Sequence, residues 1–238
     1  MNPILVALDV STAREALALA DALRGVVGGY KIGSQLFTAE GPAVVRALVD
    51  RGDRVFLDLK FHDIPNTVAG AVAAATDLGV WMVNVHAAGG PAMLAAAKQA
   101  AAEAAARRGS AAPLLIAVTV LTSMDEAALA SVGVDRSPLD QVERLARMTQ
   151  DAGLDGVVAS PQEVAAIRRA CGPSFVVVTP GIRGGTAASG PDDQRRTATP
   201  AGAVAAGASF LVIGRPITGA ADPRNAARTM AEEIATSR

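Results

Sequence analysis

Two oppositely charged side chains, Asp58 and Lys60, follow the apolar residues 55–57, and a second carboxylate, Asp63, comes three positions later. If this stretch is a strand, Asp58 and Lys60 share one face and lie about 6.6 Å apart along it. An ammonium held between two carboxylates is expected to stay protonated, because opposite charges favour the charged form. It therefore suits a general acid that protonates a developing carbanion, whereas a Schiff-base nucleophile needs a neutral amine.

Taken alone, an Asp-x-Lys pair is more often a structural ion pair, since such networks also form away from active sites. The other ends of predicted strands change that interpretation, because they too carry charged or polar residues. These are Asp9, Lys31, His86, Thr122, Arg183 and Arg215. A charged cluster gathered at one end of otherwise apolar strands indicates a functional site.

The elements that must position this cluster are short apolar strands alternating with amphipathic helical segments. We predict strands at residues 4–8, 29–32, 55–60, 81–86, 114–120, 156–159, 175–179 and 210–213, and helices at 12–23, 42–51, 68–78, 91–108, 139–152, 162–170 and 220–236. Pro65 should end the third strand before a helix opens near Asn66. Near-continuous apolar strands separated by helices are typical of a buried parallel sheet. Eight such units predict an α/β fold with one domain over residues 1–238, a (β/α)₈ TIM barrel.

Composition limits the possible functions. Half of the 238 residues are hydrophobic and 19% are charged, which excludes a disordered chain. A net charge of −1 and an aromatic content of 3% offer neither a basic field nor a stacking surface for nucleic acid. No signal-peptide pattern or long apolar run is present, so we expect a cytoplasmic protein without a membrane partner. The single cysteine, Cys171, cannot form a disulfide framework or a zinc site alone.

The ends of the seventh and eighth strands, the usual phosphate site of such barrels, each place an arginine just after a glycine. Pro180 leads into Gly181 and Arg183 in one loop, and Gly214 directly precedes Arg215 in the other. Glycine lets backbone amides approach an anion, and a guanidinium can bind phosphate oxygens in bidentate fashion. The alternative is a pair of ordinary loops with solvated arginines. The shared pattern favours a small phosphorylated substrate.

A metal site is conceivable but not favoured. Asp9, Asp58 and Asp63 could supply oxygen ligands to a hard cation, yet Lys31 and Lys60 among them would repel magnesium. His62 and His86 are interpreted as structural hydrogen-bonding residues, because the charged neighbours already supply the proton chemistry.

The motif spanning residues 58–67, Asp-Leu-Lys-Phe-His-Asp-Ile-Pro-Asn-Thr, resembles the signature of the orotidine 5′-monophosphate decarboxylase family. The resemblance covers essentially the whole chain. It extends through residues 7–9, 30–33, 85–87, 121–123, 179–183, 193–196 and 213–217.

The resemblance implies a cofactor-free and metal-free enzyme that converts orotidine 5′-monophosphate to uridine 5′-monophosphate in pyrimidine biosynthesis. Lys31, Asp58, Lys60 and Asp63 would form an alternating charge network, and Lys60 would protonate carbon 6 of the pyrimidine as carbon dioxide leaves. The remaining implied substrate contacts are Asp9 and Lys31 to the ribose and Thr122 to the pyrimidine edge. Arg183, Gln194, Gly214 and Arg215 would bind the phosphate, with Gln194 bridging towards the base, and Pro180 is a further substrate-binding residue.

The resemblance also implies a homodimer in which Asp63 and Thr67 reach into the neighbouring subunit's site. Residues 184–194, rich in glycine, would form a lid, and this segment looks about two residues longer than in the family. Two other functions stay open. One is a magnesium-dependent sugar-phosphate decarboxylase or aldolase, which would carry a Glu ligand in place of Lys31. The other is a non-catalytic barrel that binds nucleotide phosphates.

Overall fold

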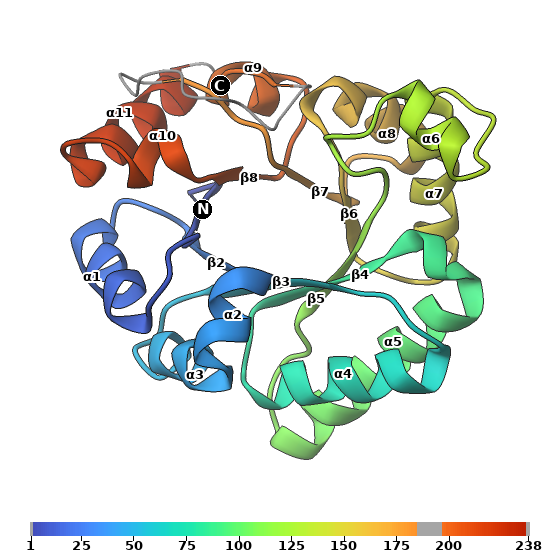
Figure 1. Cartoon of the computed structure of the whole chain (residues 1–238), viewed down its shortest axis with the longest axis horizontal. Helices are drawn as coiled ribbons and strands as arrows, with labels where there is room; N and C mark the ends of the chain where they lie inside the picture. Colours follow the sequence, from blue (N-terminus) through green and yellow to red (C-terminus); the bar gives the residue numbers. More distant parts are fainter. Residues whose placement is uncertain (1, 185–196, 237–238) are drawn as a thin grey trace.

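The computed structural model describes residues 2–184 and 197–236, which form a closed barrel of parallel strands in sequence order (Figure 1). The predicted (β/α)₈ barrel is confirmed. The strands are β1 Ile4–Ala7, β2 Gly29–Gly33, β3 Val55–Phe61, β4 Met82–His86, β5 Leu114–Val118, β6 Gly156–Val158, β7 Val176–Thr179 and β8 Phe210–Ile213. Each agrees with a predicted strand to within two residues at either end.

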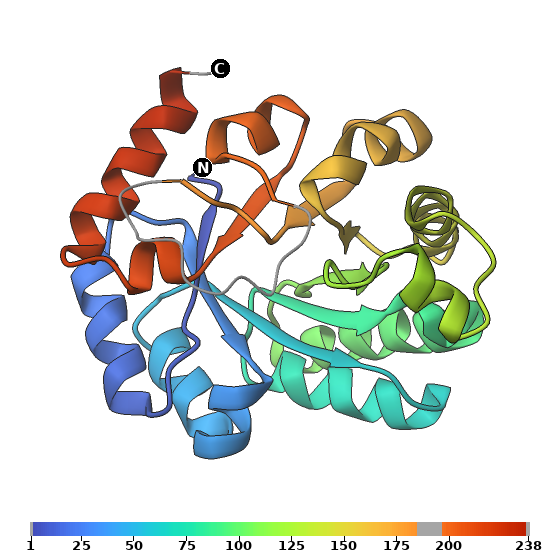
Figure 2. The same cartoon turned by 45° about the horizontal axis from the view of Figure 1, so that its top comes forward.

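Helices surround the strands in an outer ring (Figures 1 and 2). The longer ones are α1 Ala13–Leu23, α3 Pro42–Val49, α4 Pro65–Asp77, α5 Gly90–Arg108, α7 Pro138–Asp151, α8 Val164–Cys171 and α11 Pro223–Thr236, all of which were predicted. The shorter ones, not predicted, are α2 Ser34–Glu40, α6 Glu126–Ser131, α9 Pro200–Ala205 and α10 Arg215–Thr218. None of the described helices has the length and apolar character needed to cross a bilayer.

Local sequence explains where several helices begin. Thr12 caps α1 through a capping box, in which its hydroxyl accepts from the Glu15 amide and the Glu15 carboxylate accepts from the Thr12 amide. Helix α4 begins at Pro65, whose fixed φ and missing N–H suit the first helical position. The chain therefore turns into a helix directly after the charged end of β3.

The apolar side chains form two layers. Inside the barrel, Leu5, Phe56, Met82, Ile116 and Val178 pack against one another and are almost fully buried. Outside it, the alternate strand residues pack against the helices in a larger cluster. This alternation means that a polar residue in phase with Met82 on β4, or with Phe56 on β3, must point into the barrel.

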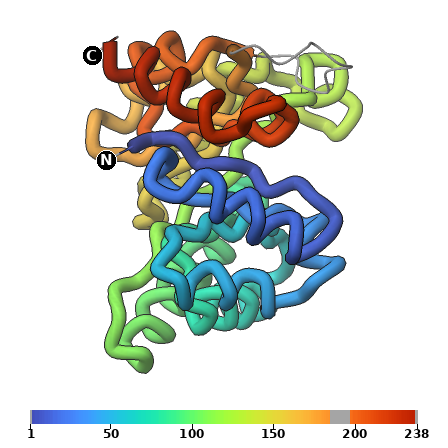
Figure 3. The backbone as a smooth tube through the Cα atoms, turned by 90° about the vertical axis from the view of Figure 1, so that its left-hand side faces the viewer, coloured from blue at the N-terminus to red at the C-terminus, as the bar shows by residue number. Residues whose placement is uncertain are grey.

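The two ends of the barrel differ. In the tube view the chain leading into β1 and the end of α11 lie on the same side of the molecule (Figure 3). Helices α4 and α5, which follow β3 and β4, lie side by side on the outside of the barrel (Figures 1 and 2). They follow the strands that carry Asp58 and Lys60 on β3 and Asn84 and His86 on β4.

Candidate active site

Four charged side chains alternate in sign across the carboxyl ends of β1, β2 and β3. The Lys31 ammonium lies 3.0 Å from the Asp9 carboxylate and 3.5 Å from one oxygen of Asp58. The other oxygen of Asp58 lies 2.7 Å from the Lys60 ammonium. The predicted gathering of Asp9, Lys31, Asp58 and Lys60 is therefore present within a single chain.

Burial makes this arrangement electrostatically strong. Asp58 and Lys31 are only 9% and 7% exposed, whereas Asp9 is exposed. Burial alone would raise the pKa of Asp58, but the charges of Lys31 and Lys60, with hydrogen bonds from Lys60 and Asn84, outweigh it and hold that pKa below its usual value. Asp58 is therefore ionised at neutral pH and attracts both ammonium groups.

Strand β3 is not regular where it carries Lys60. The pairing with β4 shifts register between Leu57 and Phe61, and Lys60 has a φ of 53°, the only positive value among the described residues other than glycine. The bulge turns the backbone at this point. The predicted alternation is nevertheless confirmed, because Asp58 and Lys60 both face the barrel mouth with their charged atoms in contact, whereas Leu57 and Leu59 pack on the outer face of the strand.

The bend in β3 depends on Asn84, a residue that sequence analysis did not single out. Its side-chain oxygen accepts a hydrogen bond from the Lys60 backbone amide at 2.8 Å, and its nitrogen donates to Asp58 at 2.7 Å. Asn84 is fully buried within β4. The available signal was a lone amide inside an otherwise apolar strand and in phase with His86.

The expectation that Lys60 lies between two carboxylates of its own chain is wrong. Asp63 is exposed, and its carboxylate accepts a hydrogen bond from the Ile64 amide at 2.6 Å. No ion pair joins Lys60 to Asp63 among the residues that the structure describes. The physical reason is the bulge, after which the chain leaves the barrel mouth and enters α4. Thr67, in the first turn of α4, is also exposed.

The loops after β7 and β8 complete the site. A cavity of about 590 Å³ at the barrel mouth is lined by nine residues that the sequence predicted: Asp9, Lys31, Asp58, Lys60, Thr122, Pro180, Arg183, Gly214 and Arg215. Gly181, which also lines it, has a φ of 76°, a conformation that glycine adopts without strain. The floor is apolar, with Phe56 and valines from three strands. Gln194 and most of the predicted lid, residues 185–194, lie outside the described residues.

Two further features of the site were missed. Gln35, at the start of α2, lines the cavity together with Ser123. A Cβ at Gly33 would lie 2.9 Å from the Lys31 ammonium and 3.4 Å from the Asp9 carboxylate. Glycine at this position therefore leaves the room in which Lys31 and Asp9 pair.

His62 and His86 lie beside the cluster, with ring centroids 5.4 Å apart. Burial, and then the electrostatic influence of the neighbouring His62 and Lys60 side chains, lowers the pKa of His86. A neutral imidazole at neutral pH is the consequence. Neither ring lines the cavity.

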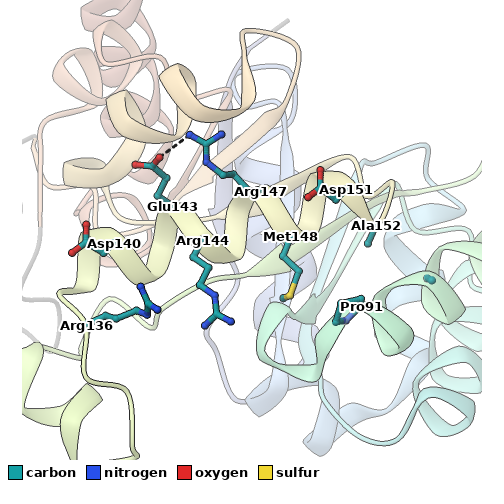
Figure 4. A pocket seen from close by; sticks show the side chains of 10 residues that line it. Pro91, Arg136, Asp140, Glu143, Arg144, Arg147, Met148, Asp151 and Ala152 are labelled. Carbon is teal, nitrogen blue, oxygen red and sulfur yellow. Dashed lines mark hydrogen bonds and ion pairs between the residues drawn. The ribbon is translucent and has the colours of Figure 1, made fainter.

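A second hollow, of about 800 Å³, lies between α5 and α7 on the outside of the barrel (Figure 4). Its lining mixes three arginines with three carboxylates, and Arg147 pairs with Glu143 at 2.8 Å. Such balanced charge selects no class of ligand. The smaller cavity at the barrel mouth, where buried charges converge, is therefore the candidate active site.

The carboxylates of the site already have partners within the protein, so few oxygen atoms remain as ligands for a metal ion. In residues 2–184 and 197–236, no three His, Cys, Asp or Glu side chains come together as metal ligands would. Asp58 accepts from the Lys60 ammonium and the Asn84 amide, and Lys31 lies between Asp58 and Asp9. Independence from metal stays a prediction for experiment.

Comparisons with known proteins point to one family. Residues 2–230 match the model of the family described as "Orotidine 5'-phosphate decarboxylase / HUMPS family". The orotidine 5'-phosphate decarboxylase of Moorella thermoacetica is 58% identical over 234 residues, 98% of this chain and 92% of that protein. That of Pasteurella multocida is 51% identical over 237 residues, covering 100% and 99%. The crystal structure of the Lactobacillus acidophilus orotidine 5'-phosphate decarboxylase superposes with a TM-score of 0.86 at 37% identity, covering 98% and 99% of the two chains.

Proposed function

The chain belongs to the orotidine 5′-phosphate decarboxylase / HUMPS family, and we propose that it converts orotidine 5′-monophosphate to uridine 5′-monophosphate and carbon dioxide. The family description includes a second group, HUMPS, so membership alone does not decide the substrate. Relatives that are more than half identical and bear the decarboxylase name support this one. The observation that carries the proposal is the alternating series Asp9, Lys31, Asp58 and Lys60 at the mouth of the barrel.

Lys60 acts as the proton donor in this proposal. The bond between carbon 6 of the pyrimidine and its carboxylate breaks, carbon dioxide leaves, and the electron pair stays on carbon 6. A proton then passes from the Lys60 ammonium to that carbon, and solvent reprotonates the amine. The 2.7 Å contact with ionised Asp58 supports this role, because it orients the ammonium.

The remaining residues of the cavity bind the rest of the nucleotide. Arg183 and Arg215, with the backbone of Gly181 and Gly214, hold the phosphate at the loops after β7 and β8. We assign the ribose to Asp9 and Lys31, the pyrimidine edge to Thr122, and a packing contact to Pro180. Gln194 belongs to the proposed phosphate contacts by resemblance. Neither a metal ion nor an organic cofactor takes part in the proposed reaction.

We further propose that the active unit is a homodimer. Asp63 and Thr67 are exposed on either side of Ile64, a hydrophobic side chain that is 66% exposed. This surface follows the strand that carries Lys60, and Lys60 itself has 36% of its side chain exposed. A second subunit covering Ile64 would carry Asp63 and Thr67 towards the neighbouring cavity.

The test is decarboxylation by purified protein in excess chelator, followed as loss of the substrate's ultraviolet absorbance and by chromatography of the product. We expect uridine 5′-monophosphate to form at an unchanged rate with and without chelator. Lys60→Ala, prepared in parallel, should be inactive. Activity that returns only with magnesium, or that is found only on a sugar phosphate, would replace this proposal by the sugar-phosphate alternative.

A further inference from the structure

Asn84 connects the two residues that the proposed proton transfer needs. The strand neighbours Val83 and Val85 pack outward against the helices, so Asn84 points into the barrel with Met82. Its amide spans from the Lys60 backbone N–H, 2.8 Å away, to the Asp58 carboxylate, 2.7 Å away. The same oxygen of Asp58 accepts from the Lys60 ammonium at 2.7 Å. These three hydrogen bonds form one closed ring of contacts.

The orientation of the Asn84 amide is fixed by chemistry. A backbone N–H can only donate, and an ionised carboxylate can only accept. The side-chain oxygen must therefore face Lys60 and the nitrogen must face Asp58. Reversing the amide would break both hydrogen bonds inside a fully buried site. Asparagine supplies this acceptor and this donor at every pH without adding charge.

The Lys60 backbone amide donates its hydrogen bond to a side chain, because no backbone carbonyl of the regular sheet pairs with it. The shift in register between Leu57 and Phe61 removes the Lys60 amide from regular pairing with β4, and the Asn84 side chain accepts from it instead. A positive φ is uncommon for a long side chain such as lysine. A local partner must therefore stabilise this conformation, and Asn84 is that partner.

We infer that Asn84 is a positioning residue for the reaction: it holds the bend in β3 and the Asp58 carboxylate, and so places the Lys60 ammonium at the reacting carbon. The inference rests on the proposed function, in which Lys60 donates the proton. Asn84 itself does not line the cavity and is not assigned a contact with substrate.

The experiment compares two substitutions at this site. Asn84→Ala removes both hydrogen bonds, and we expect kcat to fall by about 100-fold at every pH with a much smaller change in KM, the scale of a small misplacement of a catalytic group. Asn84→Asp keeps an acceptor for Lys60 but puts a carboxylate against Asp58. Two carboxylates in contact favour a shared proton, and the protonated side chain can donate to Asp58 as the amide does. Activity of Asn84→Asp should therefore rise as the pH is lowered.

Controls separate positioning from a structural role. Thr149→Val removes another fully buried hydrogen bond, from the Thr149 hydroxyl to the Leu145 carbonyl at 2.7 Å in α7. It should lower Tm without changing kcat or its pH profile. The titratable groups around Asn84 are Lys31, Asp58, Lys60 and His86, and all of them remain in wild type and in both variants. A gain in activity at low pH that is confined to Asn84→Asp therefore reports the introduced carboxyl.

Two outcomes would overturn the inference. The first is an Asn84→Ala variant whose kcat stays within about threefold of wild type, because that loss is well below the one expected from misplacement. The second is an Asn84→Asp variant with the same pH profile as Asn84→Ala. If Asn84→Ala does not fold, the pH profile of Asn84→Asp is compared with that of wild type, and identical profiles would overturn the inference. If the wild-type protein does not decarboxylate the nucleotide, the proposed function fails instead. A crystal structure of either variant then tests the positioning alone, since Lys60 should lose its positive φ in Asn84→Ala.

Discussion

Asp58 is the residue on which the charge arrangement depends. It is nearly buried, yet it interacts with two ammonium groups and one amide. An ionised carboxylate is stable in such a place only when its partners replace the water it has lost. The lowered pKa of Asp58 has this origin, and it links the active site to the stability of the fold.

We predict that Asp58→Asn abolishes activity and lowers the free energy of unfolding at pH 7 by about 1–3 kcal/mol, the cost of leaving a buried polar or charged group without its partner. Because the folded-state pKa of Asp58 is depressed, its contribution is present above the unfolded-state pKa and is lost as the pH falls through the folded-state pKa. The difference between wild type and variant should therefore shrink on acidification. Urea denaturation between neutral and acidic pH measures it, and a constant difference would contradict the assignment.

Gly33 makes a second prediction at this scale. The added methyl group of Gly33→Ala would meet the flexible end of Lys31 at 2.9 Å, so the ammonium can move away at small cost to the fold. Activity should fall by about 10- to 100-fold, as expected when a charged group is displaced by about 1 Å. Tm should change little. Steady-state kinetics and thermal denaturation check both, and a variant with full activity would mean that the position of Lys31 is not critical.

The sequence predicted the charged residues of the site, but it did not predict the residues that hold them in position. Asp58, Lys60 and Lys31 stand at strand ends, where charge in an apolar context is visible in the sequence. Asn84 acts on atoms of β3, and Gly33 leaves room for Lys31 of β2 to pair with Asp9 after β1, so their roles appear only when the neighbouring strands are side by side. The misplacement of Asp63 has the same cause, since a bulge depends on the neighbouring strand.

At the scale of elements, the strands were predictable because each is a short apolar run buried on both faces. The helices α2, α6, α9 and α10 have seven residues or fewer and show too few turns for an apolar period to emerge. Two of them matter for the site. Gln35 belongs to α2, and Arg215 begins α10 directly after Gly214.

The loops after β7 and β8 carry the next prediction. Decarboxylation to an unstabilised carbanion needs a barrier reduction on the order of 20 kcal/mol, and one preorganised electrostatic contact contributes about 3–4 kcal/mol. Binding energy from the phosphate must therefore assist. Arg215→Ala should lower activity on the nucleotide by about 10- to 100-fold, as expected for a hydrogen bond to a charged group, and should hardly change activity on the phosphate-free nucleoside.

Free phosphite provides the complementary measurement. It should partly restore turnover of the nucleoside by wild-type protein, because it can occupy the phosphate site separately. It should restore less in Arg215→Ala. Equal losses on nucleotide and nucleoside would mean that Arg215 supports the fold and not the anion.

In the whole molecule, hydrogen bonds that stabilise the fold and the residues of the candidate active site lie at opposite ends of the barrel. At the end where the strands begin, Arg168 on α8 donates to the carbonyls of Gly207, Gly172 and Pro173, and to the Ser209 hydroxyl. Burial lowers the pKa of Arg168, and these acceptors take the place of water around it. The opposite end holds the charged cavity and the exposed residues 63–67. The barrel was predictable from eight repeated units, whereas the proposed association of two barrels is marked in a single chain only by exposed side chains.

The last prediction concerns this association. In the proposed dimer each site combines Lys60 of one subunit with Asp63 of the other, so Lys60→Ala and Asp63→Ala should each be inactive alone. After subunit exchange, each mixed dimer has one site with both substitutions and one intact site, and about a quarter of all sites should be active in an equal mixture with random pairing.

Mixing Lys60→Ala with Lys31→Ala is the matched control, because both residues belong to the same subunit's site and no intact site can form. Activity measured against mixing ratio, with exchange verified by a mass-labelled subunit, distinguishes the two cases. Absence of recovery with Asp63→Ala under proven exchange would show that each barrel works with its own residues alone.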